Sequence, residues 1–484
     1  MQKNVVLIVV DQMRFDALGI NGNPMIDTPN LDDLASNGIN FTNMYSATPT
    51  CIPARASLLT GLKASRHGRV GYEEGVPWNY QQTMPKSFTD LGYQTECVGK
   101  MHVYPPRNRL GFQHVTLHDG YLHESRLLSE ASNLSSSATD DYLSWLKEKL
   151  GSDVDLIDSG LDCNSWVART WPYEEKYHPT NWTVSQAIET IKRRDPMNPL
   201  FLKVSFVRPH SPLDPPNYYL RMYEDKMNDL EEPVIGKWAN EIGIDEKFSI
   251  NFKKGRLNSK DQKRMIAAYY GLITHIDHQI GRLRMALWEH GLADNTLIAF
   301  VSDHGDQLGE HHLYRKGYPY QGSVHVPFII YDPSLQDTMN QVDVLCELRD
   351  IYPTLIDLAT GYTVKGIDGV SLKPSLFKDN KVSHQKEYYL HGEHTLGKDS
   401  SQFIITKEWK YIWYSMKNKE QLFQLEQDPN EEIDVSELAV YSAVLERLRG
   451  YLIDELTGRE EGFVQGGQLE PVKTVKNVLN HIRK

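Results

Sequence analysis

The sequence predicts an α/β fold with a large domain, in which helices flank a mostly parallel central sheet, and a small C-terminal α+β domain with an antiparallel sheet. Apolar, β-branched runs such as residues 4–10 recur along the chain and suit strands buried on both faces of a parallel sheet. Helical patterns separate these runs as far as about residue 375. Beyond it, residues 403–414 and 421–425 alternate and carry aromatics, as antiparallel strands do. We therefore expect two domains, 1–375 and 376–484.

The composition is that of an ordinary globular protein, with 484 residues, 40% of them hydrophobic and 24% charged. The net charge of −12 disfavours nucleic acids and membranes as partners, so an anionic substrate would need a local cationic pocket. Four cysteines without paired spacing do not indicate a disulfide framework. The apolar run at residues 4–10 is too short for a signal sequence or a membrane span, so we expect a cytoplasmic protein.

Four predicted strands end in polar residues that can carry chemistry. The strands and the residues that follow them are 4–10 with Asp11 and Gln12, 94–99 with Lys100 and His102, 200–207 with Arg208 and His210, and 296–301 with Asp303 and His304. In open α/β sheets, ligand sites form beyond the carboxyl ends of the strands. We therefore expect these side chains to gather at one edge of the sheet.

Helices are predicted between and after these strands. Thr28 and Pro29 supply an N-cap and a first-turn proline, and Gly38 can close that helix. The other predicted helices are 84–91, 183–194, 265–290, one that opens at residue 350, and 440–456. In the helix at 265–290, His275 and His278 could bind a metal, although docking of the helix on the sheet explains this segment better.

Residues 118–180 are polar and show no lasting periodicity. We expect an insertion with short helices over the mouth of the active site, because long irregular segments in compact domains are often functional. Its aromatic residues could line a sugar subsite, although packing on the body of the protein is the favoured use of most of them. They are Trp166, Trp171, Tyr173 and, just beyond the insertion, Trp182.

The stretch from Cys51 to Gly61 has the pattern of a short helix with a cysteine at its start. Pro53 suits the first turn, and Gly61 can take the left-handed cap. The outward N–H groups at such a helix start favour anions, and Arg55 lies one turn later on the same face as Cys51. An exposed sulfur beside a cation would be reactive. The alternative is a helix-start cysteine with no chemistry.

The motif C-x-P-x-R at residues 51–55, with Leu59-Thr60-Gly61 after it, resembles the signature of the type I sulfatases of the alkaline-phosphatase superfamily. The resemblance covers most of residues 1–435 and is weakest over 118–180 and after 440. Other segments similar to that family are Gly99-Lys100-Met101-His102, residues 209–212, residues 350–355, and, near the C-terminus, residues 409–411 and 421–431.

The resemblance implies a modified residue and a metal. In the family, a separate maturase oxidises the cysteine, here Cys51, to formylglycine (3-oxoalanine), whose hydrate is the nucleophile. The implied ligands of a divalent metal, calcium first and manganese second, are Asp11, Gln12, residue 51, Asp303 and His304. Gln12 replaces the commoner Asp and His304 stands where many members have Asn, which lowers the negative charge of the site. Gln12 could be a ligand or only lie behind the ligands.

The implied mechanism assigns a role to each basic residue. The metal and Arg55 hold one hydroxyl of the hydrate as the attacking oxygen, while Lys100 and Lys316 balance the charge on the sulfuryl oxygens. His210, or Lys316 instead, gives a proton to the leaving oxygen. His102 takes the proton of the second hydroxyl, so that the diol collapses to the aldehyde and expels sulfate.

The expected function is therefore hydrolysis of a sulfate ester of a carbohydrate or another small alcohol. One alternative is a phosphonate monoester or phosphodiester hydrolase on the same scaffold, suggested by Gln12 and His304. The other is a non-catalytic anion- or glycan-binding protein in which Cys51 stays unmodified.

Overall fold

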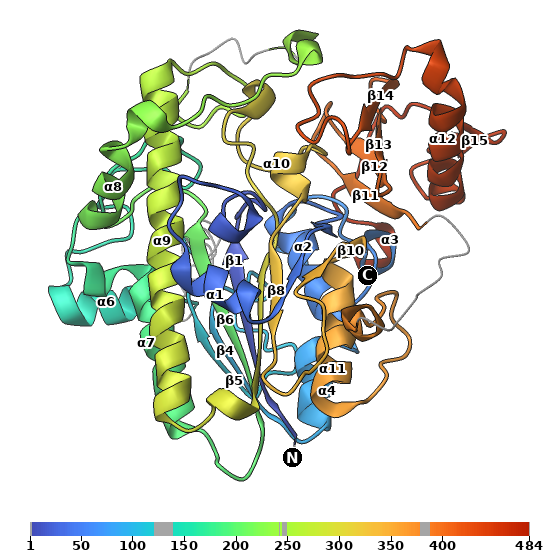
Figure 1. Ribbon diagram of the computed structural model, residues 1–484. Coiled ribbons are helices and arrows are strands. Elements are labelled where there is room, and N and C mark those ends of the chain that lie inside the picture. The colour runs from blue at the N-terminus through green and yellow to red at the C-terminus, as the bar shows by residue number, and fades with distance from the viewer. Residues whose placement is uncertain (1, 121–138, 242, 244–248, 378–387, 484) are drawn as a thin grey trace.

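The computed structural model describes residues 2–120, 139–241, 243, 249–377 and 388–483. Within this part of the chain, the largest sheet has eight strands in the order β5-β4-β6-β1-β7-β8-β2-β9 (Figure 1). In that order, the strands are His114–Leu117, Gln94–Gly99, Leu200–Pro209, Asn4–Asp11, Thr296–Ser302, Phe328–Tyr331, Ile39–Phe41 and Gln341–Val342.

Strand β1 lies at the centre of this sheet, parallel to both β6 and β7. All its residues are buried, as the unbroken apolar sequence predicts, and alternate side chains enter opposite cores. The core that contains Val6 and Ile8 includes residues of α1 (Pro29–Ser36), α7 (Pro179–Arg193), α8 (Asn217–Glu224) and α9 (Ser259–Glu289). The core that contains Val5 and Leu7 includes residues of α2 (Cys51–Thr60), α4 (Met84–Asp90) and α11 (Ile351–Thr360).

The first five strands in the sheet order, β5, β4, β6, β1 and β7, are all parallel, so their carboxyl ends lie at one edge of the sheet. Strand β8 is antiparallel to its neighbours β7 and β2, which makes the sheet mixed but mostly parallel, as predicted. Four polar clusters that are distant in sequence thereby arrive at the same edge.

A second sheet lies apart from the first and is antiparallel throughout (Figure 1). Its strands are β11 (Leu390–His394), β12 (Ser401–Ile405), β13 (Trp409–Tyr414) and β14 (Lys419–Gln424), and α12 (Ser442–Leu456) packs on one face. The predicted C-terminal antiparallel sheet is therefore confirmed, although no strand was predicted at β11. The domain boundary near residue 375 stays a prediction, and residues 378–387 beside it lie outside the described part.

Smaller elements complete the structure. They are α3 (Ala64–His67), α6 (Tyr142–Leu150), α10 (Gln321–Val324), the pair β3 (Met44–Tyr45) and β10 (Cys346–Glu347), and the pair β15 (Val464–Gln465) and β16 (Gln468–Leu469). The C-terminal segment returns to the larger part of the molecule beside α3, where Leu479 N–H donates to the Gly68 carbonyl at 2.8 Å (Figure 1). Among the described helices, none is both long and apolar enough to cross a bilayer.

Two helices begin earlier than the sequence patterns predicted, at Pro179 and Ser259, because capping residues precede their apolar faces. The Asn258 side chain, for example, accepts from the backbone N–H of Asp261 at 3.0 Å. In α9, His275 stacks on Tyr219, and Nδ1 of His278 lies 3.2 Å from the hydroxyl of the same tyrosine. Helix packing therefore accounts for both histidines.

The predicted insertion at 118–180 is only partly described, because residues 121–138 lie outside the described part. Trp171 and Trp182 are buried, at 5% and 2% exposure, which fits packing on the body of the protein. Cys163 and Asn164 from the same region line the cavity described below, so part of this segment does reach the site.

Candidate active site

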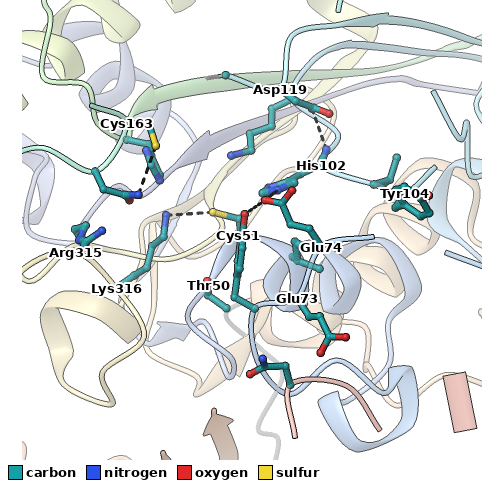
Figure 2. Close-up of a pocket in the computed structure, with 18 of the residues that line it drawn as sticks. Thr50, Cys51, Glu73, Glu74, His102, Tyr104, Asp119, Cys163, Arg315 and Lys316 are labelled. Atoms are coloured by element: carbon teal, nitrogen blue, oxygen red, sulfur yellow. Dashed lines mark hydrogen bonds and ion pairs between the residues drawn. The ribbon is translucent and has the colours of Figure 1, made fainter. Parts of the chain in front are cut away.

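The polar residues at the strand ends meet around one cavity of about 540 Å³ (Figure 2). Five of the six predicted catalytic residues line it, namely Cys51, Lys100, His102, His210 and Lys316. The sixth, Arg55, and three of the predicted metal ligands, Asp11, Asp303 and His304, are almost completely buried beside it. The sheet topology therefore brings together the residues that the sequence analysis selected.

Helix α2 places Cys51 at its first position and is capped by Gly61, which adopts the predicted left-handed conformation with φ 67°. One expectation about the sulfur was wrong. Cys51 is only 2% exposed, because every residue of α2 is buried and its apolar residues pack in the core that also contains residues of the sheet and of α11. Cys51 lines the cavity, so a molecule that enters the cavity can reach the sulfur.

Three polar groups surround the Cys51 sulfur. Nε2 of His304 lies 3.2 Å from Sγ, Nζ of Lys316 lies 3.3 Å away, and Oδ1 of Asp11 lies 3.5 Å away. Burial and Asp11 raise the pKa of the thiol, but Lys100, Lys316 and His304 outweigh them and hold it well below the usual value. Residue 51 therefore sits where negative charge is stabilised.

Arg55 points to Asp303. Its Nε donates to Oδ2 of Asp303 at 2.8 Å, and its Nη1 donates to the Lys100 carbonyl at 3.0 Å and to Oγ of Ser205 at 2.9 Å. Both members of the ion pair are fully buried. Arg55 thus fixes a candidate metal ligand and the backbone of Lys100 at the same time.

The ligand atoms of Asp11, Cys51, Asp303 and His304 all lie within 4.8 Å of one another, and all four residues are buried. Nδ1 of His304 donates to the Gly305 carbonyl at 3.0 Å, so the neutral form of the ring carries its lone pair on Nε2, which faces both carboxylates. Two carboxylate oxygens and an imidazole nitrogen that converge in a buried site fit a divalent cation.

Gln12 has a left-handed backbone, with φ 75°. Its Oε1 accepts from Nζ of Lys316 at 2.8 Å, and its Nε2 donates to Oδ2 of Asp306 at 2.5 Å. The amide therefore links Lys316 to Asp306 at the edge of the four-residue cluster.

His102 and His210 have opposite electrostatic environments. Burial and Lys100 lower the pKa of His102, but interactions with Cys51 and Glu74 outweigh them, and the pKa is raised overall. Burial and Lys316 lower the pKa of His210 to about 3. Nδ1 of His210 donates to the Ser211 carbonyl at 2.7 Å, so the neutral ring presents an unprotonated Nε2 to the cavity.

Several residues of the site were not found from the sequence. Asp119 accepts from the backbone N–H groups of Met101 and His102, at 2.7 and 2.9 Å, and it follows strand β5, so the strand-end argument could have found it. Glu74 lies 3.7 Å from Nε2 of His102. Other cavity residues, without a local sequence signal, are Arg315, His394 and Asn477.

The chain is similar to known proteins over most of its length. The Sulfatase family model matches residues 3–362, and a model described as N-sulphoglucosamine sulphohydrolase, C-terminal, matches residues 309–457. An arylsulfatase of Clostridium perfringens is 52% identical over 99% of this chain and 100% of its own length. A choline-sulfatase of Rhizobium meliloti is 28% identical over 90% of this chain and 82% of its own.

Solved structures show the same architecture. A phosphonate monoester hydrolase of Agrobacterium radiobacter superposes with a TM-score of 0.76 at 26% identity, covering 94% of this chain and 95% of that one. A protein in complex with its substrate D-glucosamine-2-N,6-O-disulfate superposes with a TM-score of 0.74, covering 94% and 98%, and at 21% identity it supports the fold alone. With the family model matching most of its length, the chain belongs to the sulfatase family of the alkaline-phosphatase superfamily and is a sulfuric ester hydrolase.

Proposed function

We propose that the enzyme hydrolyses the sulfate ester of a carbohydrate or another small alcohol, with a formylglycine derived from Cys51 and a divalent metal. One observation carries the proposal: at the end of the cavity, Sγ of Cys51 lies within 3.5 Å of a cation, an imidazole and a carboxylate of the candidate metal cluster. An anionic ester that enters would meet its nucleophile and its counter-charges at the same place.

The modification accounts for a chemical need that a thiol or a serine cannot meet. A hydrated formylglycine supplies two oxygens on one carbon. The first oxygen attacks sulfur, and the second then loses its proton, so that the carbon returns to the aldehyde and sulfate leaves. No water needs to attack sulfur. We propose that a separate maturase installs it. Conversion would precede burial of α2, because the mature chain leaves residue 51 only 2% exposed.

Each basic side chain has a proposed role that follows from its position. Lys100, paired with Asp11, and Lys316, at 3.3 Å from Sγ of Cys51, balance the charge on the sulfuryl oxygens. Lys316 gives the proton to the leaving oxygen, because the neutral His210 has its Nδ1–H engaged at Ser211 and accepts at Nε2. His102 lines the cavity with residue 51 and has its Nε2 3.7 Å from Glu74, and it takes the proton of the second hydroxyl.

The metal would be held by Asp11, Asp303, His304 and residue 51. Gln12 lies beside these ligands and accepts a hydrogen bond from Lys316. A divalent cation there would neutralise the two carboxylates and lower the cost of placing negative charge on residue 51. Calcium is the first candidate because carboxylates suit it, and manganese is the second because one ligand is an imidazole.

A phosphonate monoester hydrolase remains the second candidate. It is favoured by Gln12 and His304, which lower the negative charge of the site, and by the structural likeness to such an enzyme. Rates on an aryl sulfate and on a phenyl phosphonate ester separate the two functions. The primary proposal requires the higher kcat/KM on the sulfate, and the reverse order would refute it.

The deciding experiment combines mass spectrometry of the peptide around residue 51 with the rate of sulfate ester hydrolysis. Activity should rise with the fraction of chains converted to the aldehyde, and Cys51→Ala should be inactive. Cys163→Ala is the matched control, since it removes another cavity thiol and should stay active. A fully thiol preparation that works as fast as a converted one would refute the mechanism.

The choice of a small substrate rests on the cavity volume and on the predicted cytoplasmic location, which stays a prediction. Hydrolysis of a sulfated monosaccharide should therefore be much faster than hydrolysis of the corresponding long polysaccharide. Comparable turnover of the two would contradict this part of the proposal.

A further inference from the structure

The cavity has two charged walls, one on each side of Cys51 (Figure 2). Glu73 and Glu74 lie on one side, and Arg315 lies with Lys316 on the other. The walls differ in how their charges are compensated. Glu73 forms an ion pair with Arg483 at 2.8 Å, and Glu74 binds the Tyr72 hydroxyl and faces His102.

Arg315 has no such compensation. Within the described chain it forms no ion pair, and its Nη2 donates to a backbone carbonyl, that of Asn251, at 2.7 Å. Its Nε is buried without a hydrogen-bond partner. Burial lowers the pKa of Arg315, and the opposing charge of Asp306 offsets this effect only in part. A buried donor left unpaired is costly, and a ligand in the cavity that accepted from it would remove this cost.

The backbone holds Arg315 in a conformation that is unfavourable for a side chain of this size. Its φ is 66°, in the left-handed region. Its N–H donates to Oδ1 of Asp306 at 2.9 Å, and its carbonyl accepts from Gln307 N–H at 2.7 Å. Asp306 also binds Gln12, so the same loop fixes Arg315 and the amide that contacts Lys316. Such strain is commonly kept where it positions a functional group.

We propose that Arg315 binds a second anionic group, a carboxylate or another sulfate, on the alcohol part of the substrate. The inference rests on the proposed function, in which Lys316 faces the leaving oxygen, so that the alcohol extends along the wall that Lys316 shares with Arg315. The planar guanidinium suits two-point binding of such a group. The substrate would then be a sulfate ester of an acidic alcohol, such as a uronic acid or a disulfated sugar.

The test compares matched substrate pairs that differ in one charge. Suitable pairs are 3-carboxyphenyl sulfate with 3-carbamoylphenyl sulfate, and a uronic acid with the neutral hexose sulfated at the same hydroxyl; a disulfated hexose tests the second kind of anion. We expect wild-type kcat/KM to favour the anionic member by about 10- to 100-fold, the usual effect of one charge-assisted contact. Arg315→Gln should abolish most of this ratio, Arg315→Lys should keep part of it, and Arg315→Glu should reverse it.

The ratio is the readout because a general disturbance of Lys316 would lower both rates and leave their ratio unchanged. Arg256→Gln, which removes the same charge from an exposed arginine that does not line the cavity, should retain the wild-type ratio. Where a variant at Arg315 fails to fold, inhibition of the wild type by 3-hydroxybenzoate is compared with inhibition by the uncharged 3-hydroxybenzamide. The carboxylate should inhibit more strongly if the cavity binds a second anionic group.

Two outcomes overturn the inference and are distinguishable. If the enzyme hydrolyses aryl sulfates with a ratio near one, or if Arg315→Gln keeps the wild-type ratio, the assignment of Arg315 is wrong while the proposed function stands. If no sulfate ester is hydrolysed by a converted preparation, the proposed function fails and this inference fails with it.

Discussion

Replacing Arg55 by methionine tests the centre of the structure. The Arg55 side chain is fully buried and bridges Asp303, the Lys100 carbonyl and the Ser205 hydroxyl. Methionine fills much of the same space without a charge. The substitution therefore removes the counter-ion of Asp303 while it leaves the packing of α2 nearly intact.

The expected loss can be worked out from these contacts. A buried carboxylate that loses its partner costs about 3–5 kcal/mol of stability. The two lost hydrogen bonds add little, because Nζ of Lys203 still donates to the Lys100 carbonyl at 2.8 Å and the Ser205 hydroxyl can rotate to another partner. Burial and Asp11 already raise the pKa of Asp303. When Arg55 is removed, this carboxyl can therefore take up a proton, which keeps the loss of stability within the range of about 3–5 kcal/mol.

Urea unfolding, followed by tryptophan fluorescence and circular dichroism, measures the loss. Arg55→Met should lower the free energy of unfolding by about 3–5 kcal/mol. Lys86→Met removes one member of the surface pair with Asp90, where both side chains are more than half exposed, at 51% and 61%, and it should cost less than about 0.5 kcal/mol. The double variant Arg55→Met, Asp303→Asn should recover part of the loss. A loss below about 1 kcal/mol in Arg55→Met would refute the electrostatic account.

Three further predictions concern the metal site, pH and backbone geometry. Asp11→Asn should lose bound metal and sulfatase activity together while the circular dichroism spectrum is unchanged; full activity without added metal would contradict the assignment. Burial raises the pKa of Glu393, but Arg459, at 2.9 Å from both carboxylate oxygens, outweighs it and holds the pKa below the usual 4.5. The contribution of ionised Glu393 to the free energy of unfolding is therefore present above about pH 4.5 and lost as the pH falls through the lowered pKa. In urea unfolding, the difference in stability between the wild type and Glu393→Gln should disappear in acid, and a difference that stays constant would contradict the prediction. Gly99→Ala should destabilise the protein by more than about 2 kcal/mol, because φ is 94° and a Cβ would lie 2.0 Å from a carbonyl oxygen of β6. The control Gly92→Ala, where φ is 87° and the space around a Cβ is open, should cost only about 1–2 kcal/mol. Equal losses of stability in thermal unfolding would argue against the clash.

The sequence by itself determined the type of fold and most of the chemistry. Apolar runs with helical patterns between them predict buried parallel strands, and β1 is buried along its whole length. Because parallel strands align their carboxyl ends, Asp11, Lys100, His210 and Asp303 could be assigned to one edge before their neighbours were known. The pattern from Cys51 to Gly61 also predicted a helix with the observed start and cap. These properties depend on residues that are close in sequence.

Only the tertiary structure decided which side chains contact one another. The order of the sheet places β1 between β6 and β7, strands that are far away in sequence, and no local periodicity encodes that choice. The tertiary structure buries Cys51, points Arg55 toward Asp303 and places Gln12 where it accepts a hydrogen bond from Lys316. It also brings Arg315 to the cavity, where it forms no ion pair with any residue that the structure describes. Whether a charge is compensated depends on every segment that packs around it, so the role proposed for Arg315 could not be read from the sequence alone.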